Sequence, residues 1–186
     1  METLKKLLLF TVATVAAISL ILWTGGSFGF RSPVSAFLVN WLTMSWMAVT
    51  GQVVHLSFAP GYYRVKPFER TGQVYERLGI RLFKKLVRRG PLSIFSPTLR
   101  LPKEKTVPAL RDLENEMRKA ETGHAVIFVL VLLFAGYLLL KGWLDAVVWT
   151  MFFNMLINGY PIMLQRYNRV KMQELFRQQV GRGVTP

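Results

Sequence analysis

Cysteine is absent from this chain, and only two histidines and ten acidic residues occur among its 186 residues. Without cysteine there are no disulfides, no thiolate nucleophile and no zinc–thiolate site, while the redox compartment stays open. The shortage of acids leaves a formal net charge of +14. No RNA- or DNA-binding pattern accompanies this charge, so nucleic acid is not an expected partner. Basic charge of this kind also suits anionic lipid headgroups.

Long apolar runs are what the chain has in abundance. Four of them cover residues 7–23, 34–58, 124–140 and 144–164, and each is near the roughly 20 residues that cross a bilayer core. Only a helix satisfies its own backbone in lipid at that length. The sequence therefore predicts an all-α integral membrane protein, a single membrane domain over residues 1–186 with four transmembrane helices. The first run, which follows Lys5 and Lys6, also fits a cleaved signal peptide, and this alternative stays open.

The basic residues are unevenly distributed between the connections. Fifteen lie between Ala59 and Gly123 and five follow Leu164, whereas the two short connections hold one each, Arg31 and Lys141. By the positive-inside bias, both termini, the segment 59–123 and the tail 165–186 are cytoplasmic. The predicted location is the cell membrane, with a multi-pass topology and two short turns facing outward.

The segment 59–123 contains two helical patterns. Apolar residues recur every four positions from Gly72 to Arg89 between many cations, which predicts an interfacial amphipathic helix. Four prolines between Gly90 and Pro108 predict an ordered loop. A further helix is expected from Ala109 through His124 into the third apolar run.

Three residues at the mouth of that third run could carry chemistry. On a helix, Glu116, Glu121 and His124 share one side, and Glu121 and His124 are close enough to touch. A carboxylate beside an imidazole fixes its tautomer and raises its basicity, as a general base requires. The alternative is an interfacial ion pair that anchors the helix end.

A polar stripe runs down the fourth apolar run, and it consists of Asn154, Asn158, Pro161, Gln165 and Asn168 or Arg169. Hydrogen bonding between membrane helices explains Asn154 and Asn158 well. It explains the five polar residues 165–169 less well. A hairpin turn near Gly142 is expected to bring this stripe to the Glu/His cluster, within about one helical turn of 5.4 Å.

A metal site is the competing interpretation of the Glu/His cluster. The pattern is not H-E-x-x-H, and only one histidine lies nearby, so no metal is expected. His55, near the end of the second run, either joins the site or is a lone polar residue.

Three motifs together resemble a known family. They are Phe68-Glu69-x-x-Gly72-x-x-Tyr75, Glu116-x-x-x-Ala120-Glu121-x-x-His124 and Asn158-x-x-Pro161-x-x-x-Gln165-Arg166-Tyr167-Asn168-Arg169. The segment from Tyr62 to Phe176 resembles the glycosyl-4,4'-diaponeurosporenoate acyltransferases, small membrane proteins of the staphyloxanthin pathway. The last motif is the most specific part. The resemblance implies transfer of a fatty acyl group to a sugar hydroxyl of a glycosylated carotenoid acid.

The residues fit this chemistry, with a lipid-like acceptor arriving within the bilayer and the acyl donor, acyl-CoA or acyl carrier protein, arriving from the cytosol as co-substrate. No resident cofactor is expected. His124 is the predicted base, Glu121 its orienting group and Glu116 a further catalytic candidate. Gln165 and Asn168 are expected to stabilise the oxyanion, and Arg166 and Arg169 to bind donor phosphates or a phospholipid headgroup. The predicted substrate-binding residues are Asn158, Gln165, Arg166, Tyr167, Asn168, Arg169 and Glu69.

Two other classes of function remain as alternatives. One is a different intramembrane lipid enzyme, such as a metal-assisted hydrolase or an isomerase. The other is a non-enzymatic membrane subunit or scaffold, in which the buried polar residues serve helix packing.

Overall fold

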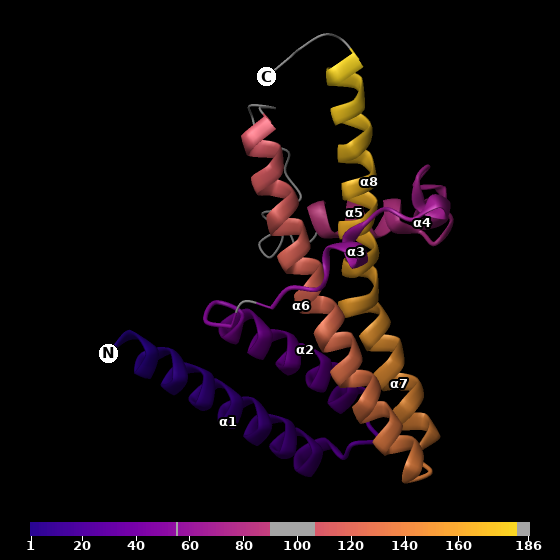
Figure 1. The fold of residues 1–186 in the computed structure, drawn as a ribbon. Coiled ribbons are helices and arrows are strands. Elements are labelled where there is room, and N and C mark those ends of the chain that lie inside the picture. Colours follow the sequence, from indigo (N-terminus) through magenta and orange to yellow (C-terminus); the bar gives the residue numbers. More distant parts are fainter. Residues whose placement is uncertain (55, 90–106, 182–186) are drawn as a thin grey trace. The chain divides into compact units, whose positions relative to one another are not determined.

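Every regular element in the described part of the chain is helical. The computed structural model describes residues 1–54, 56–89 and 107–181 (Figure 1). The predicted loop therefore lies almost wholly outside the described residues, and so does His55. The elements in chain order are α1 (Glu2–Phe28), α2 (Pro33–Thr50), α3 (Pro60–Tyr63), the 3-10 turn η1 (Pro67–Glu69), α4 (Gln73–Arg77), α5 (Ile80–Arg89), α6 (Val107–Leu140), α7 (Leu144–Asn154), the π-helical turn η4 (Met155–Gly159) and α8 (Tyr160–Gly181).

The chain divides into two compact units, each described by itself. The first unit comprises Met1–Leu56 and Thr122–Gly159, and the second comprises Ser57–Glu121 and Tyr160–Pro186. The three boundaries fall between α2 and α3, inside α6, and between η4 and α8. The long helix expected from Ala109 through His124 is confirmed, because α6 is continuous from Val107 to Leu140.

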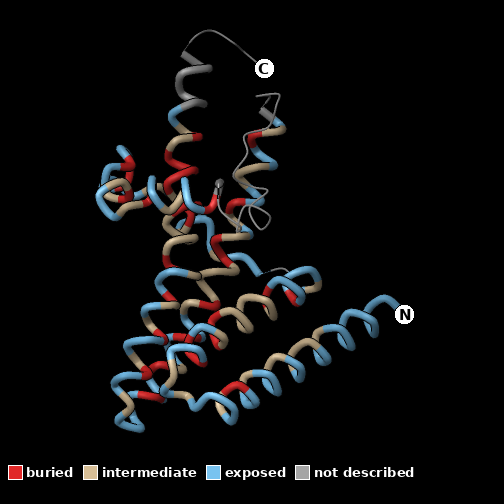
Figure 2. The backbone as a smooth tube through the Cα atoms, turned by 180° about the vertical axis from the view of Figure 1, so that it is seen from behind, coloured by how far each residue is buried: buried red, intermediate tan, exposed pale blue. Residues whose placement is uncertain are grey.

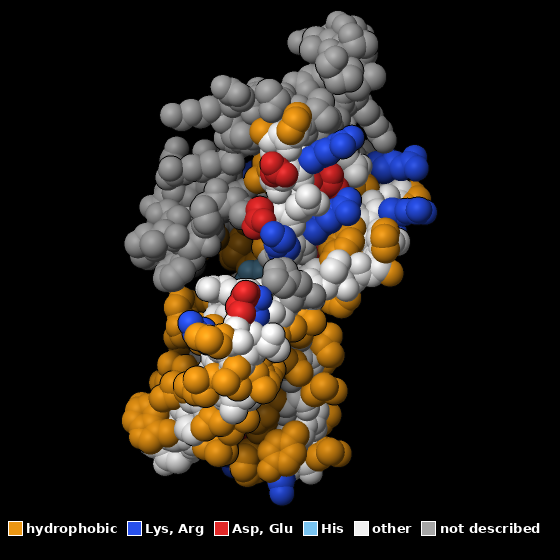
Figure 3. Space-filling view, turned by 60° about the vertical axis from the view of Figure 1, so that its left-hand side comes forward, with side chains coloured by type: hydrophobic (Ala, Val, Ile, Leu, Met, Phe, Trp, Pro, Cys, Tyr) orange, Lys and Arg blue, Asp and Glu red, His pale blue; other side chains and the backbone are white. Residues whose placement is uncertain are grey.

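The first unit has a small interior that contains both polar and apolar side chains, and its surface is largely apolar. Met47 of α2 packs on Ile127 and Val131 of α6. On α1 the Thr14 hydroxyl accepts a hydrogen bond from the Trp46 indole at 3.0 Å. Few α1 residues are buried (Figure 2), and the surface of this unit is mostly apolar in Figure 3. Large hydrophobic side chains on α1, α6 and α7 are exposed, which is expected of helices that face lipid.

Among residues 1–54, 56–89 and 107–181, three helical stretches are long and apolar enough to cross a membrane: Glu2–Phe28, Pro108–Leu140 and Leu144–Glu174. The helix expected over 34–58 is shorter than predicted. It ends at Thr50, where Gly51 caps it, and its 18 residues correspond to about 27 Å at 1.5 Å per residue. That length is slightly less than the roughly 30 Å of a hydrocarbon core. The prediction of a span extending to Phe58 is therefore wrong, and a crossing by α2 stays a prediction.

Both short turns lie at one end of the first unit. The guanidinium of Arg31, between α1 and α2, binds both carboxylate oxygens of Asp145, with the shorter contact at 2.9 Å. Asp145 follows the turn between α6 and α7, which is formed around Gly142 as expected. Gly142 has a φ of 72°, a left-handed conformation that glycine adopts without a steric penalty.

The second unit forms around α8. Tyr75 of α4 and Ile80 of α5 pack against Leu164 and Tyr167 of α8, while Leu110 and Met117 of α6 pack on Met172. The amphipathic helix predicted over 72–89 is divided in two. Leu78 ends α4, and Gly79, with a φ of 80°, separates it from α5.

This division changes which apolar residues of the segment are buried. Ile80 and Val87 face the interior, whereas the expected stripe of Leu78, Leu82 and Leu86 is exposed. An exposed leucine row beside several cations is the surface expected of an interfacial helix. Contact of α5 with lipid stays a prediction.

Candidate functional site

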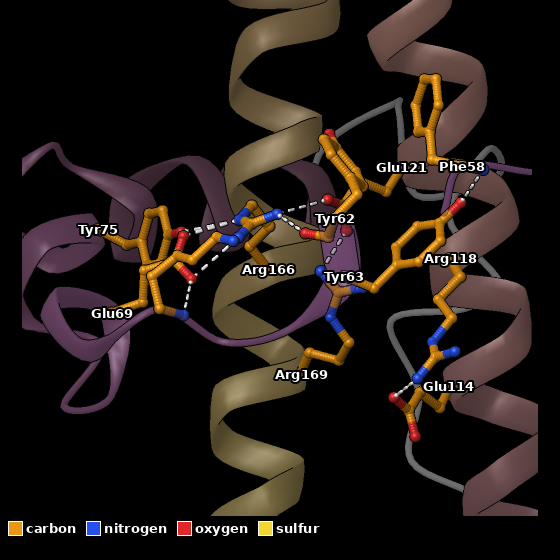
Figure 4. A network of polar contacts seen from close by, with 11 residues as sticks. Phe58, Tyr62, Tyr63, Glu69, Tyr75, Glu114, Arg118, Glu121, Arg166 and Arg169 are labelled. Atoms are coloured by element: carbon orange, nitrogen blue, oxygen red, sulfur yellow. Dashed lines mark hydrogen bonds and ion pairs between the residues drawn. The ribbon is translucent and has the colours of Figure 1, made fainter. Parts of the chain in front are cut away.

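The predicted site residues fall into two polar clusters, one in each unit. The arginine cluster of the second unit contains Glu69, Glu121, Arg166 and Arg169, with the tyrosines Tyr62, Tyr63 and Tyr75 (Figure 4). The amide–histidine cluster of the first unit contains Asn40, His124, Asn154 and Asn158.

Glu69 is held rigidly by its own turn. Its Oε2 accepts a hydrogen bond from the backbone N–H of Lys66 at 2.7 Å, which caps the 3-10 turn η1. Its Oε1 accepts one from the Tyr75 hydroxyl at 2.6 Å. Only 3% of Glu69 is exposed. A buried carboxylate is stable only when its oxygens are paired, and η1 and α4 supply part of that pairing.

Arg166 on α8 supplies the rest and donates from all three of its guanidinium nitrogens. Its Nε and Nη2 bind the two oxygens of Glu69 at 2.8 and 2.9 Å. Its Nη1 donates to the Tyr62 carbonyl and to Oε1 of Glu121 at 3.0 Å. The two-pronged contact with Glu69 matches the fork geometry that arginine offers and lysine does not. Arg166 therefore ties three segments of the second unit together: η1, α3 and α6 at Glu121.

Arg169 is buried but has donor groups to spare. One Nη donates to Oε2 of Glu121, and the guanidinium lies 5.4 Å from the centre of the Tyr63 ring. Only 1% of Arg169 is exposed, yet its Nε and Nη1 have no hydrogen-bond acceptor among the described residues. Unsatisfied buried donors are costly. Arg169 rather than Arg166 is thus the arginine with capacity to bind an oxygen ligand.

The ionisable groups of this network stabilise one another. Burial raises the pKa of the Glu69 carboxyl. Hydrogen bonds from Arg166, Tyr75 and the Lys66 amide together lower it by more than burial raises it, so the pKa lies below the ordinary value. Burial, and then the hydrogen bond to Glu69, raise the pKa of Tyr75. Two carboxylates face two guanidiniums, and the network carries no net charge.

In the amide–histidine cluster the imidazole is held by an asparagine. Nδ1 of His124 on α6 lies 3.2 Å from Oδ1 of Asn158 in the π turn η4. The Asn158 amide nitrogen donates to Oδ1 of Asn154 at 3.0 Å and to Oδ1 of Asn40 at 3.4 Å. All three asparagines are fully buried, whereas His124 is only partly buried. Glu121, the partner that the sequence predicted for this imidazole, has both oxygens engaged by arginines.

The remaining predicted residues have separate partners. Glu116 is exposed and pairs with Lys119 at 2.6 Å. The Tyr167 hydroxyl donates to Glu76 at 2.8 Å, and Asn168 Oδ1 accepts from Lys84 at 2.7 Å. Gln165 is buried, and its Oε1 has no partner among the described residues.

Asn40 and the tyrosines Tyr62 and Tyr63 are the residues that sequence reasoning missed. Asn40 is the one asparagine in the run 34–58, and a strongly polar side chain at membrane depth was a usable signal. No comparable signal marked Tyr62 and Tyr63. Their roles depend on arginines about a hundred residues away in the chain.

No group of three or more His, Cys, Asp or Glu side chains in the described part of the chain could hold a metal ion. The first unit offers a partly buried imidazole, His124, which suits proton transfer. The second unit offers an arginine with unused donors, Arg169, which suits the binding of an anionic oxygen.

The fold and composition define the class of protein: its described residues form helices alone, and three of these helices are long and apolar enough to cross a membrane. Residues 59–178 match the family model described as glycosyl-4,4'-diaponeurosporenoate acyltransferase, which covers more than half of the chain. The chain belongs to this family, and its enzyme class is that of an acyltransferase of carotenoid biosynthesis. No curated protein and no solved structure matches the chain.

Proposed function

We propose that this protein is a membrane acyltransferase that esterifies a fatty acyl group onto a sugar hydroxyl of a glycosylated carotenoid or similar glycolipid. The family match carries the proposal, because residues 59–178 include His124 and Asn158 as well as the whole arginine cluster. The exposed apolar surface of the first unit supports it as well. A carotenoid-like acceptor would reach the enzyme from within the bilayer, with its sugar at headgroup level.

His124 is the base in this proposal. It takes the proton of the sugar hydroxyl, whose oxygen attacks the carbonyl carbon of an acyl thioester. The C–S bond of the tetrahedral intermediate then breaks, and the leaving thiolate takes the proton from the imidazole. General-base assistance of this kind contributes about 10²- to 10⁴-fold in rate.

Arg169 is the donor-binding group that the contacts support best. Its unpaired Nε and Nη1 are buried donors that a phosphate oxygen of the acyl donor would satisfy. Gln165 stands one turn earlier on α8 with an unused Oε1; this oxygen is an acceptor, so its proposed contact is an N–H or O–H group of the acyl donor and not an anionic oxygen. Every guanidinium nitrogen of Arg166 already donates to Glu69, Glu121 or Tyr62, so its proposed task is to hold the cluster together.

The acyl donor, acyl-CoA or acyl carrier protein, is proposed to arrive from the cytosol. The cationic segment 59–123 and tail 165–186 face that side in the predicted topology, as positive-inside proteins do. Both termini are then cytoplasmic. No role in the reaction is assigned to Glu116, whose exposed carboxylate pairs with Lys119.

A mass-spectrometric transfer assay tests the proposal. Purified protein in lipid nanodiscs is given an acyl-CoA or an acyl carrier protein thioester, with a glycosylated carotenoid as acceptor. Wild type should form the ester, and the transfer rate of His124→Ala should be at least about 100-fold lower. Glu116→Gln should transfer at the wild-type rate. Equal rates in wild type and His124→Ala, with both proteins folded, would remove His124 as the base. Failure of wild type with every donor and acceptor would overturn the transferase assignment.

A further inference from the structure

The geometry points to Asn158 as the positioning residue that fixes His124 in its Nδ1–H form and leaves Nε2 as the reacting nitrogen. The assignment of a reaction to Nε2 rests on the proposed function, but the tautomer does not. The tautomer follows from three asparagine amides: backbone carbonyls orient Asn40 and Asn154, and these two orient Asn158.

The two outer amides are oriented by backbone acceptors. A backbone carbonyl only accepts hydrogen bonds, so the side-chain atom that contacts it must be the NH₂ group. The Asn154 amide nitrogen lies 3.0 Å from the Phe128 carbonyl. The Asn40 amide nitrogen contacts two carbonyls, those of Ala36 at 3.0 Å and Thr150 at 3.2 Å. Asn154 and Asn40 consequently present their Oδ1 atoms to Asn158.

The orientation of the central amide, Asn158, follows from the orientations of Asn154 and Asn40. Two acceptor oxygens, from Asn154 and Asn40, face one end of the Asn158 side chain at 3.0 and 3.4 Å. That end must be the NH₂ group, which has two hydrogens to donate. The other end is the oxygen, and it lies 3.2 Å from Nδ1 of His124.

The imidazole nitrogen facing that oxygen must then carry the hydrogen. If Nδ1 carried the lone pair, two acceptors would meet in a buried site without a proton between them. With hydrogen on Nδ1, a neutral ring has its lone pair on Nε2, which is the form a general base requires. The hydrogen bond to Asn158 persists when Nε2 gains a proton, so the ring keeps its orientation through the reaction.

The π turn contributes to this placement. Asn158 belongs to η4, a five-residue π-helical stretch between α7 and α8. Such a turn inserts one residue into a helix and redirects the side chains that follow, and π turns recur at functional sites. Asn158 contacts α2, α6 and α7 residues at once from this position.

Nitrogen NMR reads the tautomer without any assay of activity. Full-length protein labelled with ¹⁵N-histidine is placed in nanodiscs, in a His55→Gln background that leaves one imidazole. At a pH where the ring is neutral, long-range ¹H–¹⁵N correlations should place the proton on Nδ1. Asn158→Leu should convert this signal to a mixture of both tautomers and slow acyl transfer by about 100-fold or more.

Thr43→Val is the matched control. It removes another polar group from the first unit, a hydroxyl that only bonds to its own helix at the Val39 carbonyl. Tautomer and transfer rate should both stay unchanged in this variant. A wild-type ring protonated on Nε2, or a tautomer that Asn158→Leu leaves unaltered, would overturn the inference. An intact Nδ1–H form in an enzyme that transfers no acyl group would overturn the proposed function alone.

Discussion

At the scale of single residues, Arg166 has the largest expected effect on stability. It is the shared partner of Glu69 and Glu121, both almost wholly buried. Removing one member of a buried ion pair leaves an uncompensated charge, at a cost of about 3–5 kcal/mol. Arg166→Met should lower the free energy of unfolding in detergent by that amount. Arg166→Lys should recover only part of the loss, because an ammonium cannot bind both Glu69 oxygens side by side.

The exposed ion pair between Arg31 and Asp145 supplies the control for this comparison. Both partners are solvent-accessible, so Arg31→Met should leave the free energy of unfolding nearly unchanged. Denaturation by increasing SDS, followed by circular dichroism, measures both variants under one set of conditions. Equal losses for Arg166→Met and Arg31→Met would show that the buried network adds no stability.

The lowered pKa of Glu69 predicts how this stability depends on pH. The folded state favours the ionised carboxyl, chiefly because the hydrogen bonds of Arg166 and Tyr75 outweigh burial. The stabilisation is complete above the ordinary glutamate pKa of about 4.3 and is lost as pH falls through the lower pKa of the folded protein. The stability difference between wild type and Glu69→Gln should therefore be constant near neutral pH and shrink below about pH 4. A difference that stays the same down to about pH 3 would contradict the assignment.

At the scale of elements, Gly79 determines how the segment between α4 and α5 folds. Its φ of 80° is strained for any residue with a Cβ, while the space around it is open, with the Tyr160 hydroxyl 4.0 Å from an added methyl. Backbone strain is thus the main cost of Gly79→Ala, about 1–2 kcal/mol. Gly61→Ala is the matched variant, since Gly61 lies in α3 with ordinary φ and nothing within 4 Å. Thermal unfolding should show a lower midpoint for Gly79→Ala and no loss for Gly61→Ala. Equal midpoints would mean that the left-handed turn is not retained in solution.

The same elements show what a sequence can and cannot predict. Long apolar runs predicted α1, α6 and α7, and a glycine after the third run predicted the turn at Gly142. The break at Gly79 was missed because a glycine within a helical pattern is often tolerated, and the packing of Tyr75 and Ile80 on α8, which favours the divided form, is not visible in a local pattern. The π turn η4 was missed for a related reason, since no local pattern marks it.

For the site as well, the sequence predicted which residues matter but not how they pair. The motif positions Glu69, Glu121, Arg166 and Arg169 were all selected from the sequence, and the structure joins them. Their pairing was not predicted, because Glu69 and Arg166 are 97 residues apart in the chain. Periodicity on one helix favoured Glu121 as the partner of His124. An arginine from another helix competes for a carboxylate more strongly than a neutral imidazole does, and helix periodicity cannot show that competition.

At the scale of the whole molecule, the absence of cysteine makes the number of membrane crossings easy to measure. Four crossings put both termini on one side, whereas three crossings, with α2 outside the bilayer core, put them on opposite sides. The ion pair between Arg31 and Asp145 favours four, because it places the two short turns at one end of the first unit.

Single cysteines at Thr3, Lys141 and Glu174, all exposed, distinguish these topologies. In intact cells, a membrane-impermeant maleimide should label Lys141→Cys alone, and after lysis it should label all three variants. Labelling of Thr3→Cys and Lys141→Cys on opposite sides, with Glu174→Cys on the side of Thr3, corresponds to four crossings and cytoplasmic termini. Labelling of Thr3→Cys and Glu174→Cys on opposite sides would require an odd number of crossings. In that case the 18-residue helix α2 lies at the membrane surface, and the segment 59–123, which includes the first part of α6, is on the outer face.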